Sequence, residues 1–573
     1  MSDPRARIHT LLEAIYGQPA GAAITPRLQA MLDDFVARHP PGPPRPPAER
    51  LTENDVILIT YGDQVREPDR PPLQTLGEIL DTTFGGIVSG VHILPFFPYT
   101  SDDGFSVVDY RAVDPALGTW ADIERLSRRY RLMFDAVVNH ISASSAWFRE
   151  FLAGAPGAEA RFHVVDPATD LRGVTRPRTT PLLTSFETAA GVRHVWTTFS
   201  ADQIDLNFAN PEVLLEMTDV LLAYVEHGAS LIRLDAIGYL WKEPGTTCIH
   251  LPNTHRIVQL WRAVLDVVAP DVLLITETNV PHADNISYFG DGSNEAQLVY
   301  QFPLAPLVLH AFATGDATRL SGWARELAPP SPTTAFFNFL ASHDGIGVVP
   351  ATGILSQAEV QDLCAQVERH GGRVSYKTNP DGSQSPYELN CTWFDALSGP
   401  AGGEAPELAI GRFLASQAIM LALQGVPGVY VHSLLGSPNY QQGLQATGRF
   451  RSLNREKWTR ADLEARLADP RRREGTVLQR MARLIRARRN ERAFHPNSPQ
   501  QVLDVHPSVF ALERRTPEGD ATVLCLHNVS GAPQRAPAPA VGGARDLISG
   551  TRYPPGTDGI ELAPYQAAWL RPE

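Results

Sequence analysis

The stretch SLIRLDAI at residues 230–237 decides the fold class of this 573-residue chain. Its apolar residues follow one another without the polar alternation of a half-exposed strand, which is typical of a strand buried on both faces of a parallel sheet. Asp235 lies near the end of this stretch, and Arg233 lies two residues earlier, on the same side of the strand. A buried parallel strand that ends in charged residues predicts a functional site at the carboxyl end of the sheet.

Seven other apolar runs repeat this pattern, at 55–62, 90–97, 130–138, 271–278, 296–302, 335–342 and 426–433. Segments of helical length lie between most of them. Strands that alternate with helices predict a parallel sheet with right-handed crossovers. Eight such strands favour a closed (β/α)8 TIM barrel over an open doubly wound sheet, so we predict an α/β protein of the barrel class.

The segments outside the strands predict the domain organisation. We expect an N-terminal helical extension with a Pro-rich connector at 1–50, the barrel at 51–495 and a C-terminal antiparallel β domain at 496–573. Two connections are too long for simple loops. The segment 141–204, after the third strand, predicts a small inserted domain, and 346–425, before the last strand, predicts an insertion on the acceptor side of the site.

Composition excludes several classes of protein. Hydrophobic residues make up 43% and charged residues 20%, as in a globular chain. The net charge of −13 argues against nucleic acid or an anionic membrane as partner. The four cysteines form no CxxC motif and neither a signal peptide nor a membrane span is recognisable, so we expect a cytoplasmic protein with reduced thiols. A homodimer is compatible with the sequence, which does not determine the oligomeric state.

Four of the eight predicted strands end in ionisable or amide side chains. One such residue often only caps a strand, but four strand ends that carry them together indicate a functional site. In chain order these residues are Asp135, Asn139 and His140, then Arg233 and Asp235, then Glu277, then His343 and Asp344.

Two of these carboxylates suit a retaining glycoside transfer. One carboxylate attacks the anomeric carbon, and a protonated one donates to the leaving oxygen and then acts as base. Asp235 and Glu277 follow adjacent strands and can meet the required separation of about 5–5.5 Å. Arg233, on the same side as Asp235, can hold that carboxylate ionised.

The remaining strand-end residues suit the sugar ring. His140 and His343 can form hydrogen bonds with sugar hydroxyls. Asp344 can stabilise the charge that develops on the ring in the transition state.

In this order, the four segments resemble the signature regions of glycoside hydrolase family 13, the α-amylase family. QIDLNFANPEV at 203–213 resembles the family's additional region at the end of its inserted domain. The resemblance extends from about residue 55 to 460. It implies that Asp235 is the nucleophile, Glu277 the general acid/base and Asp344 the transition-state stabiliser. The family also contains non-catalytic transporter subunits, which lack such carboxylates and carry a membrane span.

Within the family, LITYGDQV at 58–65, GVHILPFFPYTSDDGF at 90–105 and YELNCTWFDAL at 387–397 resemble the sucrose phosphorylase group. This resemblance implies that Asp102 and Phe105 help to form the glucose pocket, with Tyr239 as a further substrate contact. The alternative interpretation is that residues 101–104 form only a polar turn.

The same resemblance implies that phosphate, the second substrate of such an enzyme, is bound by Arg178, Tyr387 and Arg455. The alternative is that the two arginines are ordinary surface residues of an arginine-rich chain. The residues by themselves do not separate phosphorolysis from hydrolysis, so an α-glucoside hydrolase remains an alternative at that level.

The acceptor side departs from the usual sucrose phosphorylase pattern. Asn279 stands two residues after the acid/base, where a histidine is usual. The segment WKEPGTTCIHLPNTH at 241–255 and the N-terminal extension resemble the glucosylglycerate-specific members. We therefore expect glucosylglycerate and phosphate to give glucose 1-phosphate and glycerate through a glucosyl-enzyme. Sucrose, sucrose 6′-phosphate and glucosylglycerol remain alternatives.

Three histidines near the fourth and fifth strands, His250, His255 and His282, raise the question of a metal site. Their spacing matches neither HExxH nor a Cys/His zinc pattern. We expect structural or substrate-contact roles for them, and neither a metal nor a cofactor in the reaction.

Overall fold

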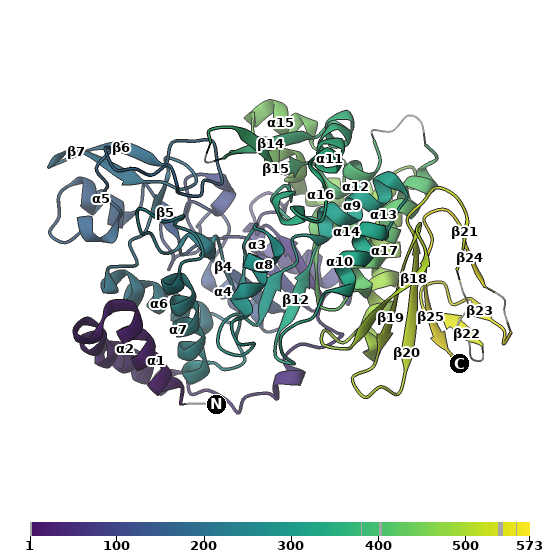
Figure 1. Ribbon diagram of the computed structural model, residues 1–573, viewed down its shortest axis with the longest axis horizontal. Helices are drawn as coiled ribbons and strands as arrows, with labels where there is room; N and C mark the ends of the chain where they lie inside the picture. The colour runs from purple at the N-terminus through teal and green to yellow at the C-terminus, as the bar shows by residue number, and fades with distance from the viewer. Residues whose placement is uncertain (1–2, 380, 400–403, 537–542, 557–558) are drawn as a thin grey trace.

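The computed structural model describes residues 3–379, 381–399, 404–536, 543–556 and 559–573. Eight parallel strands close into a barrel, which confirms the predicted TIM-barrel fold (Figure 1). Each strand pairs with its neighbours in chain order, as βαβ crossovers require. The barrel strands are β1 (Ile57–Thr60), β3 (Gly90–Ile93), β4 (Arg131–Ala136), β9 (Ala229–Leu234), β10 (Leu273–Thr276), β11 (Leu298–Tyr300), β12 (Ala335–Asn338) and β16 (Val426–Tyr430).

The barrel interior is a packed core. The strands are buried along nearly their whole length, which explains why their sequences lack polar alternation. Large and small residues alternate to fill the space: a Cβ at Gly428 on β16 would lie 2.4 Å from the Phe337 ring on the neighbouring β12. Only a glycine at position 428 leaves room for this ring.

Helices surround the barrel and cover the strands. On α6, Pro211 occupies the first turn and the Asn210 side chain caps the helix by accepting from the Glu212 N–H, so local sequence fixes where this helix begins. The helices are α3 (Pro72–Thr82), α4 (Trp120–Ser127), α6 (Pro211–Glu226), α7 (Pro252–Val268), α8 (His282–Ile286), α9 (Leu304–Thr314), α10 (Thr318–Arg325), α13 (Pro406–Ala422), α14 (Val431–Leu435), α16 (Arg460–Ala468) and α17 (Arg473–Arg489).

The N-terminal segment forms two helices, α1 (Pro4–Tyr16) and α2 (Gln18–Arg38), which pack against α6 and α7 (Figure 1, purple). Gly17, with φ of +78°, separates the two helices. Charged residues at their surface pair with the barrel helices, as in the bidentate contact from Arg27 to Glu212 at 2.5 and 2.8 Å.

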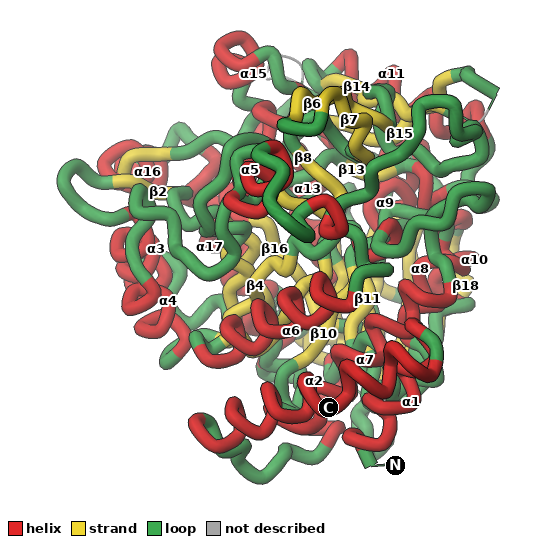
Figure 2. Tube along the Cα trace, turned by 90° about the vertical axis from the view of Figure 1, so that its left-hand side faces the viewer, coloured by secondary structure: helices red, strands yellow, loops and turns green. Residues whose placement is uncertain are grey.

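Two groups of short elements lie on the same side of the molecule, at the top of Figures 1 and 2. The first follows β4, as the sequence predicts for the inserted domain, and contains β5 (His140–Ser142), α5 (Ala146–Leu152), β6 (Leu183–Thr188), β7 (Gly191–Trp196) and β8 (Gln203–Asp205). The second lies between β12 and β16 and contains β13 (Ile346–Gly347), α11 (Gln357–Arg369), β14 (Arg373–Thr378), β15 (Gln384–Asn390) and α12 (Trp393–Leu397). Further short elements are α15 (Gln441–Thr447) and the β2–β17 pair (Val65–Arg66 and Trp458–Thr459), which contacts α3 and α16.

The C-terminal segment forms an antiparallel sheet, as predicted (Figure 1, yellow). Buried Arg514 joins this sheet to the barrel, because its guanidinium donates to the Ala422 carbonyl of α13 at 2.6 Å. The strands, in spatial order, are β18 (Gln500–His506), β19 (Val509–Arg515), β20 (Thr522–Asn528), β25 (Ala567–Pro572), β22 (Ala544–Asp546) and β23 (Arg552–Tyr553), beside the pair β21 (Gln534–Ala536) and β24 (Ile560–Leu562).

Candidate active site

Strand register places two carboxylates side by side at the carboxyl end of the barrel. Leu234 on β9 lies opposite Thr276 on β10, and the next residues along these parallel strands are Asp235 and Glu277. Both side chains line one pocket. Asp344, from the connection after β12, lines the same pocket, so three carboxylates that are far apart in sequence face a common space.

The pocket is lined by every predicted site residue except Asp135, Asn139, Arg233 and Arg455, and the first two are fully buried. Arg233 is fully buried beneath it, and Arg455 lines a neighbouring hollow. The predicted residues that line the pocket are Asp102, Phe105, His140, Arg178, Asp235, Tyr239, Glu277, Asn279, His343, Asp344 and Tyr387.

Arg233 fixes the position of the Asp235 carboxylate. Its Nη1 donates to Asp235 Oδ1 at 2.7 Å and also to Asp135, which in turn contacts His92 Nε2 at 2.7 Å. Burial raises the pKa of Asp235 above its ordinary value, and the Arg233 guanidinium acts against this rise. The same arginine, together with His92, overcomes burial at Asp135 and lowers its pKa to about 2.

The surroundings of Glu277 raise its pKa to near neutral pH. Its Oε2 accepts from the Ala236 N–H at 3.1 Å, and Arg233 Nη2 lies 3.9 Å away. Burial raises the pKa of Glu277 to about 7, and the carboxylates of Asp235 and Asp344 add to this rise while Arg233 opposes it. A carboxyl group with this pKa suits both donation and acceptance of a proton.

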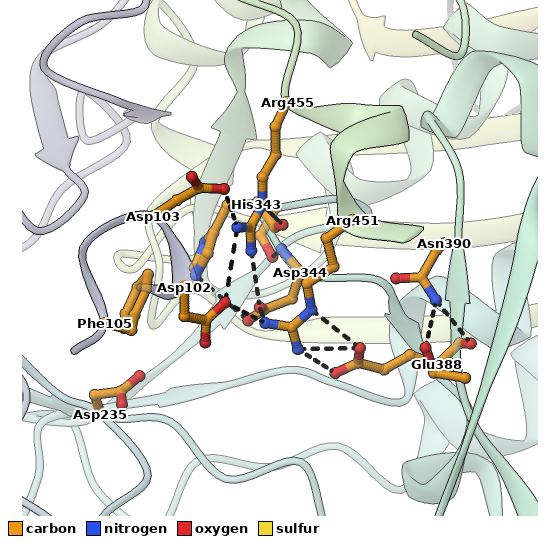
Figure 3. A network of polar contacts seen from close by, with 12 residues as sticks. Asp102, Asp103, Phe105, Asp235, His343, Asp344, Glu388, Asn390, Arg451 and Arg455 are labelled. Atoms are coloured by element: carbon orange, nitrogen blue, oxygen red, sulfur yellow. Dashed lines mark hydrogen bonds and ion pairs between the residues drawn. The ribbon is translucent and has the colours of Figure 1, made fainter. Parts of the chain in front are cut away.

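Arg451 holds Asp344 at the opposite side of the pocket (Figure 3). Its Nη1 lies 2.6 Å from Asp344 Oδ1, and its Nη2 contacts Glu388 at 2.8 and 3.0 Å. Burial would raise the pKa of Asp344, but Arg451 and His343 lower it below its ordinary value. Asp344 is therefore a fixed negative charge at the pocket wall.

An aromatic stack forms the wall where the glucose ring is expected. The Phe105 ring lies parallel to the His343 ring, with centroids 4.7 Å apart and an interplanar angle of 2°. The His140 ring nitrogen Nε2 lies 2.9 Å from the Phe105 carbonyl oxygen. Nδ1 of His343 is buried without a hydrogen-bond partner among the described residues.

Backbone strain accompanies this wall. Asp102 and Asp103 have φ of +52° and +49°, and Ala236, directly after Asp235, has +50°. Residues other than glycine adopt this left-handed conformation at a cost that the surrounding structure must offset. The strain turns Asp102 toward the pocket and Asp103 toward Arg455, whose Nη1 it binds at 2.6 Å.

The three residues predicted to bind phosphate separate into two groups. Arg178 lies 5.3 Å from the Tyr387 ring centroid and 5.9 Å from that of Phe199, and all three line the pocket. Arg455 is instead engaged by Asp103 and by the His343 carbonyl, to which its Nε donates at 2.8 Å. Its role as a phosphate contact stays a prediction.

Sequence reasoning missed several lining residues. Phe199 comes from the inserted domain, Glu388 from β15 and Arg451 from the segment before β17. Glu388 adjoins the predicted Tyr387, and Arg451 lies four residues before the predicted Arg455, so each stands beside a recognisable motif. No pattern in the chain distinguishes them from ordinary loop residues.

The described residues contain no group of three or more His, Cys, Asp or Glu side chains arranged to hold a metal ion. Within the same described ranges, no helix has the length and apolar character that a membrane crossing requires.

Comparison with known proteins agrees with this geometry. Residues 85–348 match the family model described as the α-amylase catalytic domain. The chain is 54% identical to the glucosylglycerate phosphorylase of Allomeiothermus silvanus, over 97% of this chain and 96% of the relative. It is 46% identical to the Escherichia coli protein of the same name, over 91% and 92% of the two chains. The crystal structure of sucrose 6F-phosphate phosphorylase from Thermoanaerobacter thermosaccharolyticum superimposes with a TM-score of 0.72 at 25% identity, over 83% of this chain and 94% of that one.

The chain belongs to the α-amylase family, glycoside hydrolase family 13. The family match shows this, and the (β/α)8 barrel with carboxylates after its fourth, fifth and seventh strands agrees with it. Within the family it falls in the sucrose phosphorylase subfamily, as the resemblance predicts.

Proposed function

We propose that the protein is a retaining glucoside phosphorylase that converts glucosylglycerate and phosphate into glucose 1-phosphate and glycerate. The observation that carries this proposal is the likeness of 46–54% identity, over at least 91% of the chain, to relatives named glucosylglycerate phosphorylase. Relatives named sucrose phosphorylase are 26–32% identical.

In the first step of the proposed mechanism, Asp235 attacks the anomeric carbon while Glu277 gives its proton to the departing glycerate oxygen. The bond from the anomeric carbon to that oxygen breaks as the glucosyl–Asp235 ester forms. The shared register of β9 and β10 supports the pairing of these two residues. The raised pKa of Glu277, about 7, supports its role as the acid.

In the second step, a phosphate oxygen attacks the same carbon from the face that glycerate left. Glu277, now ionised, takes the proton from phosphate, and the Asp235 carboxylate is released. Two inversions at one carbon give glucose 1-phosphate with the starting configuration. Asp344 remains ionised throughout and stabilises positive charge on the ring, a role supported by its lowered pKa beside Arg451.

We propose that the glucose ring is bound by Asp102, His140 and His343, with Phe105 as the apolar surface beneath it. The parallel stack of Phe105 on His343 supports this, because the stack fixes both rings. We also propose that Tyr239 and Asn279 contact the acceptor, since both line the pocket beside Glu277.

Phosphate binding is assigned to Arg178 and Tyr387. The guanidinium of Arg178 is held over two ring faces, and its Nη1 donates to the Pro177 carbonyl at 3.4 Å. Glu388 lies 3.9 Å from it, so the cation is only partly neutralised. The planar guanidinium keeps other N–H groups that can donate to phosphate oxygens.

The test is the reverse reaction. Purified protein is incubated with glucose 1-phosphate and, separately, glycerate, glycerol, fructose or fructose 6-phosphate, and phosphate release is measured. Glycerate should give the highest kcat/KM. A higher value with fructose or fructose 6-phosphate would assign the sucrose or sucrose 6′-phosphate reaction, and glucose release that is independent of every acceptor would indicate a hydrolase.

We propose the cytoplasm as the compartment, because glucose 1-phosphate is a charged product that stays where it is made and the four cysteines are buried free thiols. Cell fractionation with an antibody tests this. Sedimentation of the purified protein distinguishes a monomer from the homodimer that the sequence allows.

A further inference from the structure

His250 lines the active-site pocket and has no part in the mechanism above. Its ring lines the pocket together with Ile249, Asn279 and Val280. The His250 backbone has φ of +55°, a conformation that is costly for histidine, and its N–H donates to the Gly238 carbonyl at 2.9 Å. A Cβ at position 238 would lie 3.0 Å from His250 Cε1, so glycine there makes room for this ring.

A buried tyrosine holds the His250 ring from behind. The Tyr288 hydroxyl, from the 3₁₀ helix Ser287–Phe289, lies 2.8 Å from His250 Nδ1. Tyr288 is completely buried and stacks on His255, with ring centroids 4.5 Å apart. His255 in turn contacts the buried Glu295 carboxylate at 3.0 Å, so the phenol has a fixed position.

This contact determines which nitrogen of His250 carries the proton. A buried hydroxyl must donate its hydrogen, and within the described ranges its hydrogen-bond partner is His250 Nδ1. Nδ1 therefore accepts, and the ring hydrogen is on Nε2. Burial lowers the pKa of His250 to about 4, so the ring is neutral at neutral pH.

The other edge of the ring is left for a ligand. Nδ1 faces Tyr288 while the ring lines the pocket, and Nε2 forms no hydrogen bond to any described residue. His250 thus presents one neutral N–H donor beside Asn279. The apolar side chains of Ile249, Val280 and Phe302 line the same pocket and suit a short carbon chain.

We propose that His250 is an acceptor-binding residue that donates its Nε2–H to the carboxylate of a short hydroxy acid, and that Tyr288 is the positioning residue that fixes its tautomer. This inference rests on the proposed function and specifies how glycerate is selected. A hydrogen bond to a carboxylate is about twice as strong as one to a neutral hydroxyl. The N–H donor therefore favours glycerate over glycerol or fructose.

The experiment separates acceptor use from glucosyl transfer. Synthesis from glucose 1-phosphate and glycerate needs both half-reactions, whereas exchange of labelled phosphate into glucose 1-phosphate needs no acceptor. In His250→Phe, the KM for glycerate should rise about 10- to 100-fold. Phosphate exchange should stay within about twofold of wild type, because the predicted glucose and phosphate contacts are intact.

Three further variants complete the design. His250→Gln keeps an N–H donor and should recover part of the loss, and Tyr288→Phe should raise the KM for glycerate less than His250→Phe does. His282→Phe is the matched control, because His282 on α8 does not line the pocket, and it should behave as wild type.

The outcomes are distinguishable. If wild-type protein uses glycerate and both His250 variants keep its KM, the inference is wrong while the proposed function stands. A parallel loss of phosphate exchange in His250→Phe and His250→Gln also overturns it, because the residue would then act on the glucosyl site. If the wild type prefers an acceptor without a carboxylate, the proposed function and the inference both fail.

Discussion

Replacing Glu277 with glutamine should abolish turnover and yet stabilise the protein, by an amount that depends on pH. Glutamine resembles the protonated acid in shape but carries no charge. Burial raises the pKa of Glu277 from 4.5 to about 7, so the folded protein holds this proton more tightly than the unfolded chain does. The difference corresponds to about 3 kcal/mol between the two protonation states.

The sign follows from proton binding. Below pH 4.5 both states of the wild type are protonated at Glu277, so the variant should match it. Between pH 4.5 and about 7 the unfolded state has lost the proton and the folded state has kept it, so wild-type stability falls by about 1.4 kcal/mol per pH unit from this group. Above pH 7 the variant should be more stable by about 3 kcal/mol.

Urea unfolding of both proteins from pH 4.5 to 8.5, followed by tryptophan fluorescence, measures this difference. The control is Glu187→Gln, at an exposed position on β6, which should show no gain that grows with pH. A stability difference for Glu277→Gln that is flat across this range would refute the argument, since it would show that burial does not strain the ionised carboxylate. Wild-type kcat/KM for glucosylglycerate should also fall above pH 7. Glu277 must be protonated to act as the acid, and above its pKa of about 7 the protonated fraction decreases.

Other substitutions test the remaining parts of the site. Asp235→Asn should lower glucose 1-phosphate formation by at least about 10⁴-fold, because no glucosyl-enzyme can form, and activity within tenfold of wild type would exclude the assignment. Arg178→Gln should raise the KM for phosphate about 10- to 100-fold in steady-state kinetics, and an unchanged KM would place phosphate elsewhere. Lys242→Met should lower the free energy of unfolding by about 3–5 kcal/mol in urea titration, because it leaves buried Asp205, now 2.6 Å from the ammonium group, without a counter-charge. Combining Lys242→Met with Asp205→Asn should recover part of this loss, and a double variant as unstable as the single one would count against the ion pair.

The barrel could be predicted because its strands are buried on both faces. Short runs rich in apolar residues, such as SLIRLDAI, are typical of buried parallel strands, and each of the eight predicted runs overlaps one barrel strand. The carboxylates could be predicted for a related reason. Asp235 and Glu277 lie near the ends of such runs, and parallel strands bring their carboxyl ends to one side.

The pocket wall could not be predicted in this way. Glu388 and Phe199 lie in the two long connections and Arg451 lies after the last barrel strand, where neither periodicity nor spacing specifies the path of the chain. The resemblance groups Arg455 with the phosphate contacts, and in the fold its guanidinium also pairs with Asp103, so its role toward phosphate stays a prediction.

The sequence by itself determined the barrel, the order of its strands and the chemical types at their ends, because these depend on local hydrophobic pattern and on parallel register. Tertiary structure alone decided the protonation and orientation of the groups. The pKa of Glu277 rises to about 7 only when folding removes water from it, and the ring hydrogen of His250 is placed on Nε2 only when Tyr288, which is 38 residues away in the chain, is packed against it. Burial and long-range contact set these properties, and neither exists until the chain has folded.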